Sequence, residues 1–232
     1  MLTEDELLRL RRLSTLFLND KEFSGAGAMH ISDEVAAAVA LQACLPILNL
    51  GLSRYDGFKG IVLHVDEVVA HRSETDGDGI VHEYDEPISG EAMQGGPVML
   101  SWRDVADAGE TAAWAYNVVI HEFAHVLDMH SATSQAHLAT PELREAHQRW
   151  LQALSQEFQH FVRTVDSGIH TLLDPYGSES MEEFFAVASE AFFVQASEMQ
   201  QAQSDLYELM RRYYQQDPAA RRFKTPTPAS RR

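Results

Sequence analysis

Two histidines four residues apart place the tightest constraint on how this chain folds. His121 and His125 lie in an apolar segment, 114–127, and neither Pro nor Gly occurs between Thr111 and Met129. A segment of this kind predicts a helix of about four to five turns. Residues four apart lie on one face of a helix, so both imidazoles can reach a single cation.

The residue that follows the first histidine, Glu122, completes the pattern His-Glu-x-x-His. Zinc accepts imidazole nitrogens at roughly 2.0–2.1 Å, and a catalytic zinc takes three protein ligands and keeps one position open for water. Glu122 is rotated by about 100° from His121, where its carboxylate can take a proton from that water. The alternative is an ordinary helix, but burying two imidazoles and a carboxylate without partners would be costly. We therefore expect one zinc ion per chain, with a third ligand elsewhere.

Charge and cysteine content exclude several classes of protein. The 232 residues include 18 Lys and Arg against 35 Asp and Glu, a formal charge of −17. Such a chain has no basic excess with which to bind nucleic acid directly or to bind an anionic membrane. The single Cys44 cannot form an intrachain disulfide and fits a reducing compartment. The N-terminus is acidic and no apolar stretch reaches about 18 residues, so we expect a cytoplasmic protein.

Local patterns predict an α+β fold that is mostly helical, with a small mixed sheet before the metal-binding helix. The capping box Thr3-x-x-Glu6 opens a helix through about Leu18, and the cap at Ser32 opens a second helix, from Glu34 to about Leu48. Further elements are expected as strands at 61–65, 80–82 and 98–101, a loop at 73–79, and helices at 140–165, 180–197 and 204–216. The domain expected is 1–218, made of a helical cap (1–50), a small sheet (51–110) and a metal-binding helical part (111–218), followed by a disordered basic tail (219–232).

The third zinc ligand is expected on the helix that begins near residue 180. Glu183 and Glu190 share one face of this helix, and that face is otherwise apolar. A carboxylate there needs a partner to stay ionised, and zinc would be one. Glu183 could instead only cap the helix with Ser180, and Glu179, Glu182 and Glu190 remain alternatives.

Several segments resemble the Mlc titration factor A family, over roughly residues 7–218. They are Leu45-Pro46-Ile47-Leu48, Tyr55-Asp56-Gly57-Phe58, Gly96-Pro97-Val98-Met99-Leu100-Ser101-Trp102, His121 through Asp128, Glu183 through Glu190 and Tyr213-Tyr214-Gln215-Gln216-Asp217-Pro218. The resemblance implies a zinc-dependent peptidase with a zincin-like (gluzincin) fold, similar to the catalytic core of anthrax lethal factor.

The same resemblance implies roles for individual residues. Glu183 matches the third zinc ligand, and Tyr176 matches a tyrosine that faces the developing oxyanion. From the residues alone, Tyr176 could instead be an aromatic side chain that packs a turn. Lethal-factor-like sites carry a second glutamate one turn after the ligand, where this chain has Val187. Glu190, two turns along, is a candidate for orienting a ligand histidine. By its position three residues after His125, Asp128 is another candidate for contacting one, or it could instead help to end the helix.

Together these features predict hydrolysis of peptide bonds by a zinc-activated water with Glu122 as the general base. The resemblance suggests short peptides and aminopeptidase-type cleavage. The segment Val98–Ser101 is expected to be an edge strand that pairs with an extended substrate. The alternative is a regulatory protein that sequesters a transcriptional repressor of the Mlc type, with catalysis secondary.

Overall fold

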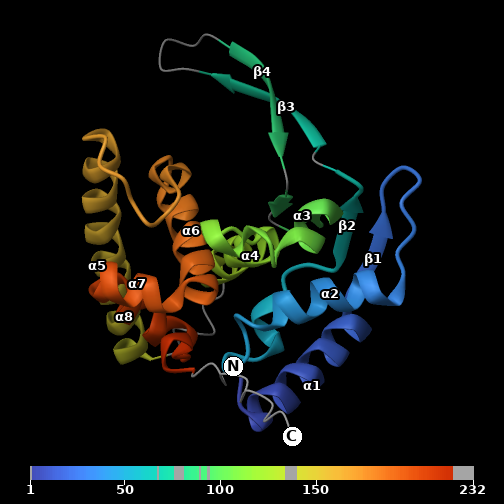
Figure 1. Ribbon diagram of the computed structural model, residues 1–232, viewed down its shortest axis with the longest axis horizontal. Helices are drawn as coiled ribbons and strands as arrows, with labels where there is room; N and C mark the ends of the chain where they lie inside the picture. Colours follow the sequence, from blue (N-terminus) through green and yellow to red (C-terminus); the bar gives the residue numbers. More distant parts are fainter. Residues whose placement is uncertain are drawn as a thin grey trace, which may run out of the picture.

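The computed structural model describes residues 2–66, 68–75, 81–88, 90–92, 95–133 and 140–221, with only the backbone described in 68–75, 81–88 and 130–133. The architecture is α+β, as predicted: most of it is helical, with a four-stranded mixed sheet. Figure 1 shows a helical group, α5 to α8, on one side and the sheet with α1 and α2 on the other. The helix α4 (Val118–Thr133) lies between them and contacts both.

The two N-terminal helices begin where the capping patterns predict. Helix α1 (Glu4–Asp20) opens with the full Thr3 and Glu6 capping box, and α2 (Asp33–Cys44) opens with the Ser32 hydroxyl accepting from a backbone N–H. The expected second helix reaches Leu48, but α2 ends at Cys44 and continues as turns, followed by the short 3-10 helix η1 (Leu52–Tyr55).

The sheet has the strand order β1-β2-β6-β5. Strands β1 (Glu22–Gly25), β2 (Gly60–His64) and β6 (Val98–Ser101) are parallel, and β5 (Gly90–Ala92) is antiparallel to β6. The prediction that Val98–Ser101 is an edge strand is wrong, because β6 pairs with β2 on one side and β5 on the other. Its burial agrees: three of its four residues are buried.

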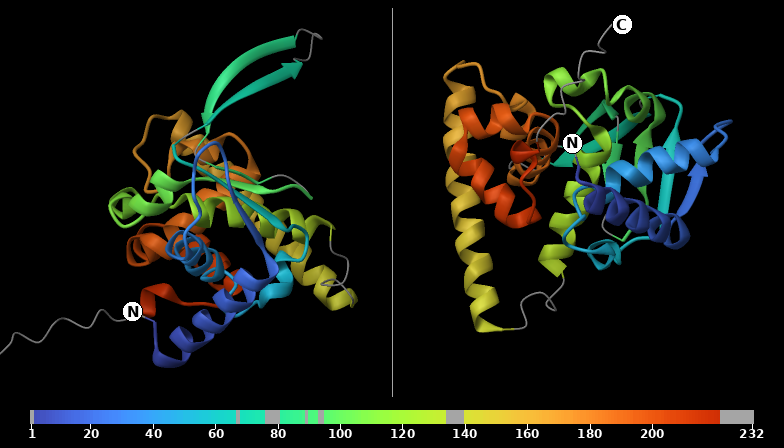
Figure 2. Two further views of the ribbon diagram at one scale, coloured as in Figure 1. Left: turned by 90° about the vertical axis from the view of Figure 1, so that its right-hand side faces the viewer. Right: turned by 60° about the horizontal axis from the view of Figure 1, so that its bottom comes forward.

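A separate two-stranded ribbon leaves the sheet between β2 and β5. It consists of β3 (Val68–Thr75) and β4 (Val81–Ile88), paired antiparallel over their whole length. Figures 1 and 2 show the ribbon standing away from the body of the protein. The loop expected at 73–79 is a strand up to Thr75, and its remainder lies outside the described residues.

The predicted metal-binding helix is shorter at its start than expected. The short helix α3 (Trp102–Asp107) and the 3-10 turn η2 (Thr111–Trp114) precede it. Ala115 then adopts a left-handed conformation, φ 60°, which ends any continuous helix, and α4 begins three residues later. Trp114, expected within the helix, is outside it and 76% exposed.

The C-terminal half is a group of helices packed through aromatic rings. It contains α5 (Pro141–Asp166), η4 (Pro175–Ser178), α6 (Met181–Val194), α7 (Ala196–Ala202), α8 (Ser204–Tyr214) and η5 (Pro218–Ala220). The helix expected at 180–197 is divided at Gln195 into α6 and α7. Phe185 of α6 packs against Trp150 of α5 and against Tyr213 and Tyr214 of α8.

A second aromatic cluster fixes α4 against the N-terminal half. Phe123 contacts Phe17, Tyr55 and Phe58, with ring centroids 5.0–5.8 Å apart. Phe123 is fully buried and follows Glu122 directly, so its packing sets the rotation of the helix that carries both histidines. Truncating such a ring to alanine typically costs about 3–5 kcal/mol.

The ordered chain extends beyond the boundary predicted for the tail. Residues 219–220 belong to η5, and Arg221 lies 3.1 Å from Glu6 of α1. The rest of the predicted tail, 222–232, lies outside the described residues. Among the residues that are described, no helix combines the length and the apolar character needed to span a bilayer.

Candidate metal centre

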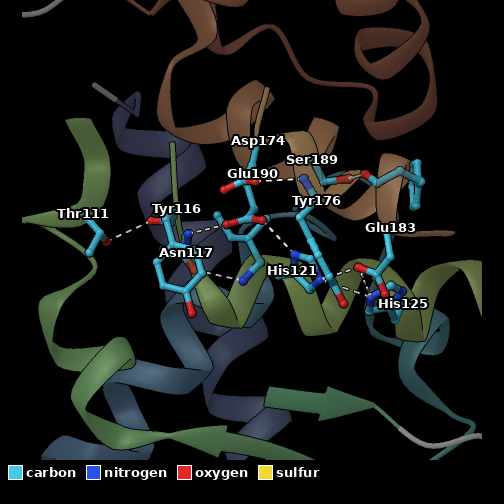
Figure 3. Close-up of polar contacts among 12 residues, drawn as sticks. Thr111, Tyr116, Asn117, His121, His125, Asp174, Tyr176, Glu183, Ser189 and Glu190 are labelled. Carbon is cyan, nitrogen blue, oxygen red and sulfur yellow. Dashed lines mark hydrogen bonds and ion pairs between the residues drawn. The ribbon is translucent and has the colours of Figure 1, made fainter. Parts of the chain in front are cut away.

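Two helices bring the predicted metal ligands together. His121 and His125 lie one turn apart on α4, and Glu183 lies in the first turn of α6 (Figure 3). Helix α4 begins after Asn117, whose side-chain oxygen accepts from the N–H of Ile120 at 2.9 Å. This is an N-cap, and it fixes the start of the helix one turn before His121.

The three side chains meet at one point. The Nε2 atoms of His121 and His125 are 3.2 Å apart, and Glu183 Oε2 lies 3.0 Å from the first and 3.4 Å from the second. Within the described residues, this is the group of His, Cys, Asp or Glu side chains close enough to hold a metal ion. The predicted ligand set is therefore assembled as a cluster by residues 62 positions apart in sequence.

The other glutamates considered as third ligand are not part of the cluster of three. Glu179 and Glu182 are exposed, whereas Glu183 is half-buried against the histidines. The capping alternative is present only in part. The Ser180 hydroxyl accepts from the Glu183 N–H at 3.1 Å, but the Glu183 carboxylate contacts His121 and His125.

Glu190 holds His121 from the opposite side of the imidazole. Its Oε1 accepts from His121 Nδ1 at 2.7 Å, while its Oε2 accepts from the backbone N–H of Asn117. Nδ1 is thereby engaged as a donor, which leaves Nε2 facing Glu183 and His125. Metal-binding histidines commonly donate their second ring nitrogen to a carboxylate in this way.

Asp128, the other candidate for contacting a ligand histidine, does not have that role. The His125 ring has no hydrogen bond to Asp128 among the described contacts, and helix α4 continues to Thr133, so Asp128 does not end it either. Burial and repulsion from Glu182 raise the pKa of Asp128, with His125 and His147 opposing.

Contacts within the cluster shift the pKa values of its buried ionisable side chains. Burial alone would lower the pKa of His121, but its hydrogen bonds to Glu183 and Glu190 raise that pKa to about 10. Burial would raise the pKa of Glu183, and the two histidines instead lower it to about 2. Burial raises the pKa of Glu190, opposed by its bond to His121. These shifts share one physical cause, the close contact of the His121 ring with the carboxylates of Glu183 and Glu190.

Glu122 lies beside the ligand group and is only 5% exposed. Burial raises its pKa to about 7, although His121 and His125 act in the opposite direction. Strand β5 runs directly over it. A Cβ added to Gly90 would lie 2.6 Å from both Cγ and Oε1 of Glu122. Only glycine allows the strand to come this close to the Glu122 side chain.

Tyr176 lies on the other rim of the cluster, in η4. Its ring centroid is 6.2 Å from that of His121, and the residue is 42% exposed (Figure 3). Asp174 caps the turn by accepting from the Tyr176 N–H at 2.9 Å. Gly177 lets this turn pack closely on α6, since an added Cβ would meet Val187 at 3.3 Å. Val187, one turn after Glu183, thus packs against that turn.

Gly90 is the residue that sequence reasoning missed. It lies in a three-residue strand, too short for an alternating pattern to reveal. A signal was nevertheless present, because an isolated glycine in a strand often marks the close approach of another group.

Comparison with known proteins places this site in context. Residues 1–215 match the family described as glucose-regulated metallo-peptidase M90. A protein of unknown role from Synechocystis is 34% identical over 221 residues, covering 94% of this chain and 79% of that protein. Mlc titration factor A of Cronobacter sakazakii is 31% identical over 231 residues, covering 98% and 86%. Mlc titration factor A of Pectobacterium atrosepticum is 29% identical over 222 residues, covering 95% and 83%.

Proposed function

This chain belongs to the glucose-regulated metallo-peptidase M90 family, and from that premise we propose that it is a zinc-dependent peptidase. The observation that carries the proposal is the spacing of the three ligand atoms. A tetrahedral ion with bonds of roughly 2.0–2.1 Å separates its ligand atoms by about 3.3–3.4 Å. The separations of 3.0, 3.2 and 3.4 Å among His121, His125 and Glu183 fit that geometry with little movement.

The fold we propose is zincin-like, in a single peptidase domain over residues 1–218. Support comes from α4, which contacts the sheet, the N-terminal helix α2 and the C-terminal helix α6. The antiparallel edge strand β5 crosses over α4 at Glu122, and α6 supplies the acidic ligand. The sheet and the C-terminal helices thus meet at the candidate site, and α2 packs on the helix that carries the histidines.

In the proposed mechanism, Glu122 moves the proton. A zinc ion held by the ligand cluster would polarise the scissile carbonyl and make an attacking water more acidic. Glu122 takes the proton from that water and passes it to the leaving amine. Burial beside two imidazoles suits this role, because a base with a pKa of about 7 both accepts and releases protons at neutral pH.

Glu190 and Tyr176 complete the proposed site. Glu190 fixes the orientation of the His121 ring through Nδ1 and is itself held by the Asn117 backbone. The Tyr176 hydroxyl would donate a hydrogen bond to the oxyanion that forms when the carbonyl is attacked. One well-placed donor of this kind is worth roughly 3–4 kcal/mol of transition-state stabilisation.

The substrate class we propose is a short peptide, cleaved as by an aminopeptidase. Because β6 is internal, the role expected of it passes to β5, the strand at the exposed edge of the sheet next to Glu122. An extended peptide could add to this edge through backbone hydrogen bonds. The family resemblance supports the preference for a free amino terminus.

The test combines metal analysis with a panel of chromogenic amino-acid and peptide substrates. Glu122→Gln should retain stoichiometric zinc and lose nearly all hydrolysis. Glu183→Ala should lose zinc, whereas Glu182→Ala, an exposed neighbour on the same helix, should keep it. Undiminished hydrolysis by Glu122→Gln would show that Glu122 is not the general base. Full zinc content in Glu183→Ala would show that another residue is the third ligand.

A second candidate function is supported by the relatives named Mlc titration factor A. The chain would then act mainly by binding a repressor of the Mlc type. A pulldown of such a repressor with the Glu122→Gln protein separates the two functions. Retained binding by the inactive variant would support a binding role that does not need catalysis.

A further inference from the structure

A groove on the side of the molecule formed by η1, α5 and α8 has an unusual lining. Its volume is about 610 Å³, within the range of ligand-binding pockets. The residues that line it are Leu50, Arg54, Leu143, Ala146, His147, Arg149, Trp150, Ala153, Leu209, Arg212 and Tyr213. None of them belongs to the metal cluster or touches Glu122 in the contacts described above.

The charge of the lining is opposite to that of the whole chain. Three arginines and a histidine line the groove, and no aspartate or glutamate does. The full chain carries nearly twice as many acidic as basic residues and a formal charge of −17. Gathering three guanidinium groups around one hollow therefore creates a local positive potential on an otherwise negative protein.

The three guanidinium groups can accept new partners. Arg54 has no ion-pair partner among the described residues. Arg149 pairs with Glu145 at 2.7 Å, but both side chains are exposed, and exposed pairs contribute little stability. Arg211 and Arg212 both pair with the carboxylate of Glu208, so a single negative charge there faces two positive charges.

Besides the arginines, the groove is lined by apolar and aromatic side chains. The rings of Trp150 and Tyr213 stack with centroids 4.9 Å apart and form one wall. The Trp150 indole N–H donates to the backbone of Leu209 at 3.4 Å, which fixes the ring. Leu143 lies in the lining and is 49% exposed. A ligand that carries apolar groups as well as negative charges would match this surface.

We propose that the groove binds an extended segment of a partner protein in which acidic residues alternate with apolar ones. Side chains of an extended segment point alternately to opposite sides, so carboxylates can reach the arginines while apolar side chains face the aromatic wall. Guanidinium groups pair with carboxylates through paired N–H donors. Nucleic acid is disfavoured, since its many phosphates would meet the strongly negative remainder of the chain.

Helix α6 connects this groove with the metal cluster while keeping the two apart. Trp150 and Tyr213 pack on Phe185 of α6, with centroids 5.8 and 5.1 Å away. Phe185 follows Glu183 by two residues, so the two side chains leave the helix about 200° apart. The groove and the metal ligands therefore lie on opposite faces of one helix, and a bound segment leaves the metal cluster free.

The experiment measures fluorescence anisotropy of a six-residue peptide of alternating glutamate and leucine, carrying a neutral fluorophore. Full-length Glu122→Gln protein is used so that the peptide is not hydrolysed. At about 50 mM salt, the glutamate peptide should bind at least about tenfold more tightly than a peptide with glutamine in place of each glutamate. Raising the salt concentration should weaken the binding of the glutamate peptide. Adding Arg54→Gln or Arg212→Gln should weaken binding about tenfold or more each.

Arg163→Gln provides the matched control, because Arg163 is exposed on α5 outside the groove. Added to the Glu122→Gln protein, Arg163→Gln should leave the affinity for the peptide unchanged. Thermal melts should show that every variant is folded. Equal affinity for the glutamate and glutamine peptides would overturn the proposal, as would no binding or undiminished binding by the arginine variants. Displacement of the labelled peptide by citrate, at concentrations as low as those at which the peptide itself binds, would overturn the proposal and instead identify a pocket for small anions.

Discussion

Replacing Gly90 with alanine should impair catalysis by moving one carboxylate. The added Cβ would lie 2.6 Å from Cγ and Oε1 of Glu122 and 2.7 Å from its Cδ. Ordinary van der Waals contact begins near 3.4 Å, so the Glu122 side chain must retreat by about 0.8 Å, the difference between the two distances. Because Cγ is among the atoms that come too close, the side chain must turn from Cγ outward, and the carboxylate at its end moves with it.

A displacement of this size is large for a catalytic group. Misplacement by about 1 Å can cost on the order of 100-fold in rate. We therefore expect Gly90→Ala to lower kcat about 100-fold, or about 2.7 kcal/mol in the barrier. Gly90 does not have a positive φ, so alanine is compatible with the backbone, and the melting temperature should change by only a few degrees.

The assay is steady-state hydrolysis by Gly90→Ala, with zinc content and thermal melts measured on the same preparations. Gly60→Ala is the matched control, since it lies in the neighbouring part of the sheet and its Cβ would meet Pro97 rather than the site. In the Glu122→Gln background, Gly90→Ala should lower kcat almost no further, because the carboxylate that it displaces is already absent. Wild-type turnover by Gly90→Ala, or a full additional loss in the double variant, would refute the reasoning.

Three further predictions follow from the contacts around the site and in the core. Glu190→Gln should weaken zinc affinity about 10- to 100-fold in competition with a chelating dye, while the exposed Glu182→Gln should not; equal affinities would show that the contact with His121 Nδ1 is unimportant. The raised pKa of His121, about 10 in the metal-free protein, means that zinc must displace a proton, so affinity should rise about tenfold per pH unit between pH 7 and 9. Calorimetry in buffers of different ionisation enthalpy should detect about one proton released, and a flat profile would contradict the raised pKa. Lys21→Ala should lower the free energy of unfolding by about 2–3 kcal/mol in urea denaturation, because the buried ammonium donates to two backbone carbonyls; an unchanged transition midpoint would show that these bonds contribute nothing.

The helix that carries the two histidines, and the cluster that they form with Glu183, were predictable because their signals are local or periodic. The spacing of the two histidines places them on one face of a helix. Helical phase favoured Glu183 without excluding Glu179, Glu182 or Glu190, and the family resemblance then singled out Glu183. Thr3 and Ser32 marked helix starts correctly because their signals are local as well. The seven-residue step from Glu183 to Glu190 also indicated a shared face, although not which histidine nitrogen each would contact.

Features that depend on tertiary contacts were not predictable. Strands β1 and β5 have four and three residues, and they exist because β2 and β6 provide pairing partners. The edge position was assigned to β6, since nothing in the sequence reveals that β5 returns antiparallel beside it. The start of α4 was placed too early because Ala115, normally a strong helix former, takes a left-handed conformation here.

The attachment of the β3–β4 ribbon has a consequence for engineering and for evolution. The ribbon leaves after His64 of β2 and returns at Gly90 of β5, and both residues lie at the same end of the sheet, on either side of β6. Two strand spacings separate these points, about 10 Å, which a linker of four or five residues can bridge. We therefore expect that the ribbon can be shortened, lengthened or replaced while β2, β5 and β6 keep their register.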